Sequence, residues 1–248
     1  MIEARHLKKS FGTHRVLDGV SFSIEKGASV VIIGASGGGK SILLKHLIAL
    51  LVPDEGDVLV DGEPLAHKNE RELLEVRRRF GMLFQGAALF DSMTVGENIG
   101  FLLRREGKMS EPEIKERVAE VLEMVDLGGT QEKMPAELSG GMRKRVGLAR
   151  AIVYRPEIIL YDEPTTGLDP IVSDSIDQLM LRVVERLKVT SIVVTHDMRS
   201  ARRIAQRILM LHEGKIYANG TPDEIFASKD PIIHRFVHGI SEAKEHRF

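Results

Sequence analysis

The chain has 248 residues, of which 43% are hydrophobic, and its 35 basic and 36 acidic side chains leave a formal net charge of −1. This balance gives no electrostatic footprint for nucleic acid, and the lack of cysteine excludes disulfides, thiol catalysis and cysteine-bound metal. The N-terminal residues 1–12 have no apolar signal-peptide core, and the longest apolar stretch is broken by Lys45 and His46 and is too short to span a bilayer. We therefore expect a cytoplasmic protein that acts at a membrane only through a partner.

The N-terminal region predicts strands. Residues 4–27 alternate apolar and polar side chains and break at Gly12 and Gly19, which indicates short antiparallel strands. Residues 28–34, ASVVIIG, are largely apolar and β-branched, which is typical of a strand buried on both faces.

Helix and strand patterns then alternate. Residues 40–51 carry apolar side chains at helical spacing, and we expect Pro53 to stop that helix. Residues 57–65 predict a strand that ends at an Asp-Gly turn, and residues 80–85 predict another buried strand.

A helical pattern dominates from about residue 95 to residue 153. Its clearest helix begins at a capping box formed by Ser110 and Glu113. We interpret residues 86–155 as a helical subdomain inserted into an α/β core.

The core pattern resumes with a strand, a long helix, a strand, a hairpin and two short helices, at residues 157–162, 170–187, 190–196, 207–220, 222–226 and 230–239. We therefore expect one α/β domain over residues 1–240 with a mostly parallel sheet, followed by a tail at residues 241–248. Two short basic runs, at residues 77–79 and 143–145, fit solvated helix faces.

A glycine-rich stretch lies between the first buried strand and the first helix. It fits G-x-x-x-x-G-K-[ST] in the context that this motif requires, and consists of Gly34, Ala35, Ser36, Gly37, Gly38, Gly39, Lys40 and Ser41. Its backbone N–H groups and the helix N-terminus can converge on phosphate oxygens. Lys40 would reach the β- and γ-phosphates and Ser41 would ligate Mg²⁺, whereas the alternative is a glycine-rich turn without a ligand.

Polar residues follow three further predicted strands. Asp162 would hold Mg²⁺, and Glu163 would act as general base or orient the attacking water, unless the two residues only cap a helix. Gln85 can ligate Mg²⁺ or the lytic water, and His196 can donate to the γ-phosphate, although a histidine at a strand end is usually structural. Because parallel strands end at one sheet edge, we expect these side chains to meet there.

Several motifs occur in one order along the chain: GASGGGKS, Gln85, LSGGM, IILYDE, GLDP and His196. In this order they resemble the ATP-binding cassette (ABC) ATPases over nearly the whole length. The resemblance implies a P-loop NTPase (RecA-like) core with an N-terminal antiparallel β subdomain and the inserted α-helical subdomain of that family. It also implies ATP and Mg²⁺ as cofactors.

The resemblance gives a role to the LSGGM loop. In that family this loop caps the γ-phosphate bound by a second copy, so that two subunits enclose two ATP molecules. Ser139, Gly140 and Gly141 would therefore serve the partner's nucleotide, and Asp169 would lie at the dimer seam. Phe11 is placed where the family stacks an aromatic ring on adenine; a core phenylalanine is the alternative reading.

Two residues depart from the usual family pattern. Met142 replaces the glutamine that usually ends the signature, and a thioether cannot supply the donors of an amide. Ile42 replaces a threonine after Ser41 and removes one phosphate hydrogen bond. We expect weaker nucleotide contact without loss of binding.

LSGGM, the segment LFQGAALFDSMTVGENI and the ending HRFVHG resemble a narrower group, the ATPases of Mce/Mla-type lipid transporters. That resemblance implies a peripheral protein at the cytoplasmic side of the inner membrane, with permease subunits as partners. A small regulatory subunit and a periplasmic lipid-binding component are further expected partners. The alternatives are an importer of amino acids or other small solutes, a non-transport cassette, and a scaffold that binds ATP without turnover.

Overall fold

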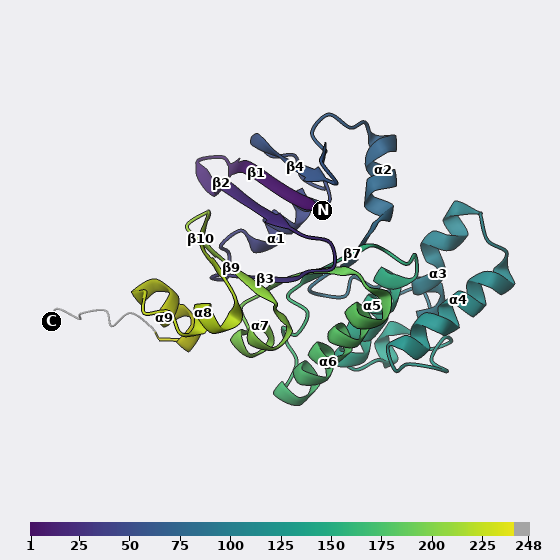
Figure 1. Cartoon of the computed structure of the whole chain (residues 1–248). Helices are drawn as coiled ribbons and strands as arrows, with labels where there is room; N and C mark the ends of the chain where they lie inside the picture. Colours follow the sequence, from purple (N-terminus) through teal and green to yellow (C-terminus); the bar gives the residue numbers. More distant parts are fainter. Residues whose placement is uncertain (241–248) are drawn as a thin grey trace.

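The computed structural model describes residues 1–240, so the expected tail at residues 241–248 lies outside the described part. Two β-sheets form the body of the molecule, and the helices α3 and α4 project from it at the end opposite to α8 and α9 (Figure 1). Within residues 1–240, no helix has both the length and the apolarity that a bilayer span requires.

The smaller sheet is antiparallel, in the order β2-β1-β4-β5. Its strands are β1 (Ile2–Phe11), β2 (His14–Ile24), β4 (Glu55–Val60) and β5 (Glu63–Pro64). The expected turn at Gly12 is confirmed, but the expected break at Gly19 is wrong. Strand β2 continues through Gly19 as a bulge with φ +78°, where the register shifts between Leu7 and Lys8.

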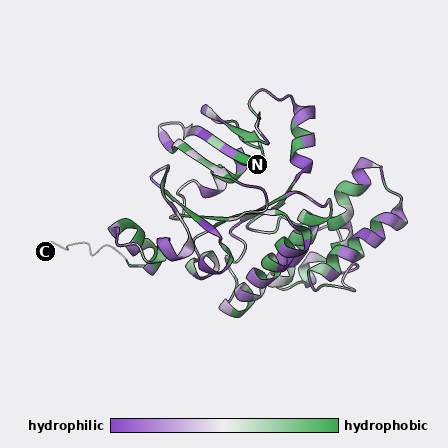
Figure 2. Ribbon diagram, viewed as in Figure 1, coloured by the Kyte–Doolittle hydropathy of each residue, from purple (hydrophilic) through white to green (hydrophobic). Residues whose placement is uncertain are grey.

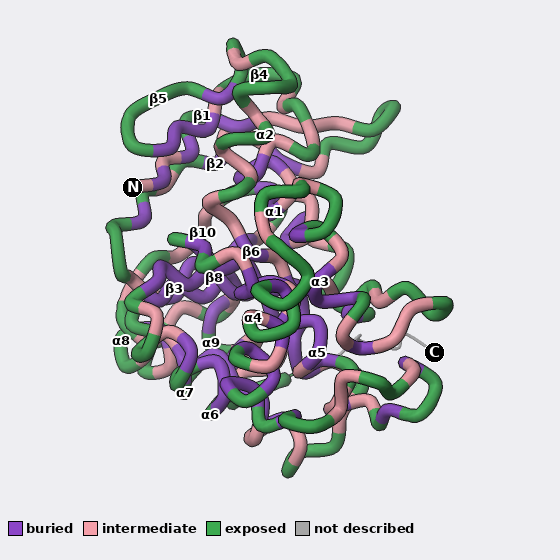
Figure 3. Tube along the Cα trace, turned by 90° about the vertical axis from the view of Figure 1, so that its right-hand side faces the viewer, coloured by how far each residue is buried: buried purple, intermediate pink, exposed green. Residues whose placement is uncertain are grey.

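The larger sheet has the order β10-β9-β3-β8-β7-β6. Its strands are β3 (Ser29–Ile33), β6 (Phe80–Leu83), β7 (Ile158–Asp162), β8 (Thr190–Thr195), β9 (Arg207–His212) and β10 (Lys215–Gly220). Every pairing from β9 to β6 is parallel, and only β10 runs antiparallel, so the expected mostly parallel sheet is confirmed. All residues of β3, β7 and β8 are buried, and Figure 3 shows this buried centre.

The helices are α1 (Lys40–Leu47), α2 (Glu70–Arg78), α3 (Val95–Glu106), α4 (Glu111–Met124), α5 (Gly140–Ile152), α6 (Pro170–Leu187), α7 (Met198–Ile204), α8 (Pro222–Phe226) and α9 (Pro231–His238), with a 3₁₀ turn at Pro135–Glu137. The expectation that Pro53 stops α1 is wrong. The helix ends at Leu47, because Ala49 adopts φ +52° and the Leu50 N–H turns back to the Lys45 carbonyl oxygen.

No pattern in the sequence predicts α7, and α2 is foreshadowed only by the basic run at residues 77–79, which fits a helix face. Helix α2 has no fully buried residue, and Figure 2 shows it as largely hydrophilic. Its apolar stripe is short and consists of Leu73, Leu74 and Val76, of which Leu73 and Val76 pack against the core beneath the smaller sheet. The N-terminus of α2 is fixed by a capping box between Asn69 and Glu72.

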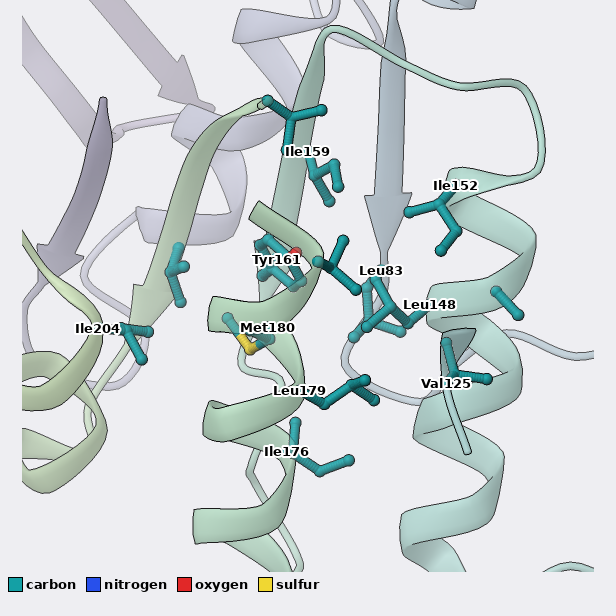
Figure 4. Packing of buried hydrophobic residues seen from close by; sticks show 14 of the residues in the cluster. Leu83, Val125, Leu148, Ile152, Ile159, Tyr161, Ile176, Leu179, Met180 and Ile204 are labelled. Carbon is teal, nitrogen blue, oxygen red and sulfur yellow. The ribbon is translucent and has the colours of Figure 1, made fainter. Parts of the chain in front are cut away.

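A continuous hydrophobic core joins the projecting helices to the large sheet. The α4 stripe is buried against α5, and the same cluster continues through Leu83 and Tyr161 to α6 (Figure 4). The Glu113 carboxylate accepts bonds from the Ser110 N–H and hydroxyl at 2.7 and 2.6 Å, which confirms the expected capping box. The division at residues 86–155 stays a prediction.

Candidate functional site

Residues that follow four strands of the larger sheet line a cavity of about 380 Å³. The loop 34–39 follows β3, Gln85 comes two residues after β6, and Glu163 and His196 directly follow β7 and β8. The lining residues are Phe11, His14, Val16, Ser36, Gly37, Gly39, Lys40, Ser41, Ile42, Gln85, Glu163 and His196. The structure thus brings together most of the residues that the sequence proposes for the nucleotide.

The glycine loop needs its glycines for two physical reasons. Gly39 has φ +92°, and a Cβ there would lie 2.8 Å from Val16 Cγ1. A Cβ at Gly34 would lie 2.4 Å from the Leu211 carbonyl oxygen, so the backbone passes too close for any side chain. The loop leads directly into the N-terminus of α1, where unpaired N–H groups favour an anion.

Lys40 is the first residue of α1, and its buried side chain folds back against the loop. Its ammonium donates to the Gly34 and Ala35 carbonyl oxygens at 2.8 and 3.1 Å, and lies 3.4 Å from Glu163 Oε1. The cation is therefore held between the loop and the acidic residue that follows β7, on the wall of the cavity.

Glu163 and His196 form a hydrogen-bonded pair. Glu163 Oε2 lies 2.8 Å from His196 Nδ1 and accepts a bond from the Thr166 hydroxyl at 3.1 Å. Glu163 is buried, whereas the His196 side chain is 49% exposed and faces the cavity. Glu163 has φ +48°, a strained conformation for a non-glycine residue, which requires firm support from its surroundings.

The oxygen donors expected for Mg²⁺ also meet. The Ser41 hydroxyl donates to Asp162 Oδ1 at 2.6 Å, and Gln85 lines the same cavity. Mg²⁺ takes hard oxygen ligands, usually one or two carboxylates completed by water and substrate phosphates. The Ser41 hydroxyl and the single Asp162 carboxylate beside a phosphate loop fit this ligand set.

Phe11 ends β1 at the rim of the cavity. Its side chain is 48% exposed, and the Lys9 ammonium lies 5.7 Å from the ring centroid. The alternative reading of Phe11 as a core residue is therefore wrong. Stacking on adenine stays a prediction.

We expect Phe11→Ala to raise the KM for ATP by about 2- to 10-fold with little change in kcat, because ring stacking is worth ~0.5–1.5 kcal/mol. Steady-state ATPase kinetics measure this. Phe22→Ala, on the neighbouring strand β2 and outside the cavity lining, is the control. An unchanged KM in Phe11→Ala would exclude the stacking role.

The LSGGM loop lies outside this cavity. Ser139 caps α5 by accepting a bond from the Met142 N–H at 3.3 Å, and its side chain is exposed. A Cβ at Gly141 would lie 2.7 Å from Val172 Cγ1 of α6, and Asp169 caps α6. A Cβ at Gly140 would lie 3.2 Å from Leu168 Cδ2. Ser139, Gly140, Gly141 and Asp169 thus form a second group, distinct from the residues around Lys40.

Met142 and Ile42, which depart from the usual family pattern, both pack against hydrophobic residues. Met142 is partly buried and packs against the main hydrophobic core. Ile42 lines the cavity and packs on the cluster beneath the smaller sheet. Neither side chain can donate a hydrogen bond to phosphate.

The expectation that residues 143–145 form a solvated helix face is wrong at Lys144. This side chain is 5% exposed, and its ammonium donates to the carbonyl oxygens of Gln85 and Glu163. Burial lowers the pKa of Lys144, and the charges of Asp162 and Glu163 oppose that shift. A signal existed in the sequence: Lys144 falls at helical spacing from Gly141 and Leu148, on the apolar side of α5. The other run, residues 77–79, is partly exposed and makes surface ion pairs.

Comparison with known proteins agrees with this geometry. A family model described as ABC transporter matches residues 17–166. The chain is 42% identical to the probable ribonucleotide transport ATP-binding protein mkl of Mycobacterium leprae (strain TN) over 96% of this chain and 69% of that protein. It is 39% identical to the intermembrane phospholipid transport system ATP-binding protein MlaF of Haemophilus influenzae, over 98% of this chain and 92% of that protein.

A solved structure is similar as well. The dimeric post-hydrolysis state of the ATP-binding cassette MJ0796, bound to ADP and Pi, superimposes with a TM-score of 0.81 at 33% identity, over 90% of this chain and 99% of that one. The family model, the sequence relatives and the fold agree, and this chain belongs to the ABC transporter family as one of its ATP-binding cassette ATPases.

Proposed function

We propose that two copies of this ATPase enclose two Mg–ATP molecules and drive a permease that moves phospholipid or other lipid between inner and outer membranes. The observation that carries the lipid assignment is the similarity to MlaF, whose name describes intermembrane phospholipid transport, over 92% of that protein's length. The protein would lie at the cytoplasmic side of the inner membrane, bound to the permease.

The arrangement of the two polar groups supports the two-copy site. The exposed Ser139 and the N-terminus of α5 are separate from the cavity around Lys40 in the same chain. A helix N-terminus carries partial positive charge and attracts phosphate. A second copy can therefore present Ser139, Gly140 and Gly141 to the triphosphate held by Lys40, with Asp169 at the seam.

Each residue of the cavity then has a chemical task. Lys40 binds the β- and γ-phosphates, and His196 donates to the γ-phosphate while it holds the Glu163 carboxylate. Glu163 takes the proton of the attacking water or orients that water. Ser41, Asp162 and Gln85 would hold Mg²⁺, which supplies positive charge to the phosphate oxygens.

A second cavity offers a place for the permease. It measures about 760 Å³, lies between α2, β6, α3 and α5, and its apolar wall includes Leu74, Met82, Phe84, Phe90, Phe101 and Leu102. The Phe90 side chain is 45% exposed, and its ring lies 5.1 Å from that of Phe101. The segment from Gln85 to Met93 joins the two cavities, because Gln85 lines the nucleotide cavity and Phe90 lines the second one. We therefore propose that a coupling helix of the permease binds in the second cavity and that nucleotide binding changes this contact through the segment.

We expect Phe90→Asp to reduce transport by about tenfold or more, because a buried charge destroys an aromatic anchor of an interface. ATP binding to the isolated subunit stays unchanged. Transport in reconstituted vesicles and nucleotide binding in solution are measured in parallel. Leu181→Asp, on the distant helix α6, is the control. Unchanged transport by Phe90→Asp would remove the proposed dock.

The alternative cargo is a small solute, such as an amino acid. Isolation of the complex from membranes, with mass spectrometry of bound proteins and lipids, separates the two. Co-purified permease with phospholipid supports lipid transport, as would a small regulatory subunit or a periplasmic lipid-binding component. A solute-binding partner without lipid would contradict it.

A further inference from the structure

One face of helix α5 contacts the end of β6 and the segment that follows this strand. A Cβ at Gly147 would lie 2.7 Å from Leu83 Cδ1 and 3.1 Å from Ala87 Cβ, so the helix and this segment are in close contact. One turn further on, the Arg150 guanidinium donates to the carbonyl oxygens of Ala87 and Ala88, each at 2.7 Å. Residues three apart share a helix face, so the contacts form one seam.

Lys144 is the member of this seam nearest to the LSGGM loop. Its ammonium donates to the Gln85 carbonyl oxygen and, at 3.1 Å, to that of Glu163. The two acceptors belong to different strand ends, after β6 and after β7. One side chain of the signature helix therefore holds the backbone of two residues that the hydrolytic site uses.

Glu163 needs such support. Its φ of +48° is strained, and the strain persists only where surrounding contacts determine the conformation. The Glu163 N–H donates to the Val194 carbonyl oxygen at 3.0 Å, and the Glu163 carbonyl oxygen accepts bonds from the Lys144 ammonium at 3.1 Å and from the Thr166 N–H at 3.3 Å. Of these partners, only Lys144 connects the Glu163 backbone to α5.

Simple packing does not account for a lysine at this position. Burial of an ammonium is costly unless hydrogen bonds compensate, and a methionine would fill a similar volume without that cost. The neighbouring side chains Val146, Leu148 and Ala149 are apolar and buried, as α5 otherwise requires. What lysine adds at this place is its set of N–H donors.

We propose that Lys144 is a positioning residue that links the signature loop at the start of α5 to Gln85 and Glu163 of the same chain. It thereby holds the Glu163 backbone in place for cleavage in the chain's own site, and through the same contact the capping of the partner's ATP raises the rate of that cleavage above the rate of a single composite pocket. The inference rests on the proposed two-copy site. Movement of α5, when Ser139 and its neighbours engage a nucleotide, reaches the carboxylate through the Lys144 ammonium.

The first test is kinetic. Lys144→Met should lower kcat about tenfold or more, change the KM for ATP less than about threefold, and reduce the Hill coefficient for ATP towards ~1. Lys144→Arg, which retains donors and charge, should keep at least about half of the wild-type kcat. Arg155→Met, which removes a charge beyond the end of α5, should match wild type. Should Lys144→Met fail to fold, Lys144→Gln is measured instead, with the same expectation.

A merely structural lysine would give a different pattern. Loss of kcat that Lys144→Arg does not restore, or a kcat of Lys144→Met within about twofold of wild type, would overturn the proposal.

The second test locates the effect within the dimer. A chain with Lys40→Ala is mixed with a chain with Ser139→Ala, so that one composite pocket survives, with Lys40 and Glu163 from the second chain. Lys144→Met in that second chain should lower the turnover of the mixture about tenfold, whereas in the first chain it should change it less than about twofold. Equal effects in both chains would overturn the link to Glu163. A mixture that shows no turnover even with Lys144 intact would instead contradict the two-copy site.

Discussion

Glu163→Gln is expected to lower ATP hydrolysis by about 10²- to 10⁴-fold while ATP still binds, because a general base contributes a factor of this size and an amide cannot take a proton. The glutamine keeps the shape of the side chain between His196 and Thr166, so the pocket itself is retained. ATP then stays intact between two copies, and an ATP-bound dimer accumulates. Phosphate release and size-exclusion chromatography with Mg–ATP measure the two effects.

The matched control for this variant is Glu157→Gln, at the opposite end of β7. Glu157 is an exposed carboxylate that pairs with Arg79 at 2.8 Å, away from the cavity. The Glu157→Gln variant should hydrolyse ATP at the wild-type rate. Equal rates for Glu163→Gln and wild type would refute the base assignment. The alternative that Asp162 and Glu163 only cap a helix is wrong, because the next helix, α6, begins at Pro170 and is capped by Asp169.

Lys40→Ala is expected to reduce kcat/KM by about 10²-fold or more, since each hydrogen bond from a charged donor is worth ~1.5–3 kcal/mol and Lys40 serves two phosphates. The variant also leaves the buried Glu163 without the cation that lies 3.4 Å away. Equilibrium binding of ATP and steady-state hydrolysis together show whether affinity, turnover or both are lost.

Lys45→Ala provides the control for Lys40→Ala. Lys45 lies in the last turn of the same helix, α1, and outside the cavity lining. Its replacement by alanine removes the same charge as Lys40→Ala but leaves the phosphate site intact. We expect wild-type binding and turnover for it. Near-normal ATP affinity and hydrolysis in Lys40→Ala would exclude the phosphate role of the loop.

The fold could be predicted where local patterns decide it. Buried strands such as β3 and β8 are dominated by β-branched residues, and the long helix α6 has an N-cap, an apolar stripe and clear ends. The full length of α2 was harder to predict, because its apolar stripe is limited to Leu73, Leu74 and Val76 and none of them is fully buried. The bulge at Gly19 and the early end of α1 depend on positive-φ conformations, at Gly19 and Ala49, that the pattern of apolar residues does not encode.

The candidate site divides in the same way. The glycine loop and the strand-end residues follow from local motifs and from the rule that parallel strands end at one edge. Lys144 was missed because it sits between two arginines, although its helical spacing from Gly141 and Leu148 places it on the apolar side of α5. Its hydrogen bonds to the Gln85 and Glu163 carbonyl oxygens could not be predicted from that spacing. The role of Ser139 was supplied by the family resemblance, since no local pattern tells which molecule a loop faces.

The central claim is that one triphosphate is bound by surfaces of two molecules, around Lys40 in one and Ser139 in the other. The most direct measurement mixes Lys40→Ala chains with Ser139→Ala chains, each inactive alone, and records ATP hydrolysis against the mixing ratio. The account predicts that activity returns and peaks at equal amounts, where heterodimers with one intact pocket are most abundant. A mixture as inactive as its components at every ratio would contradict it.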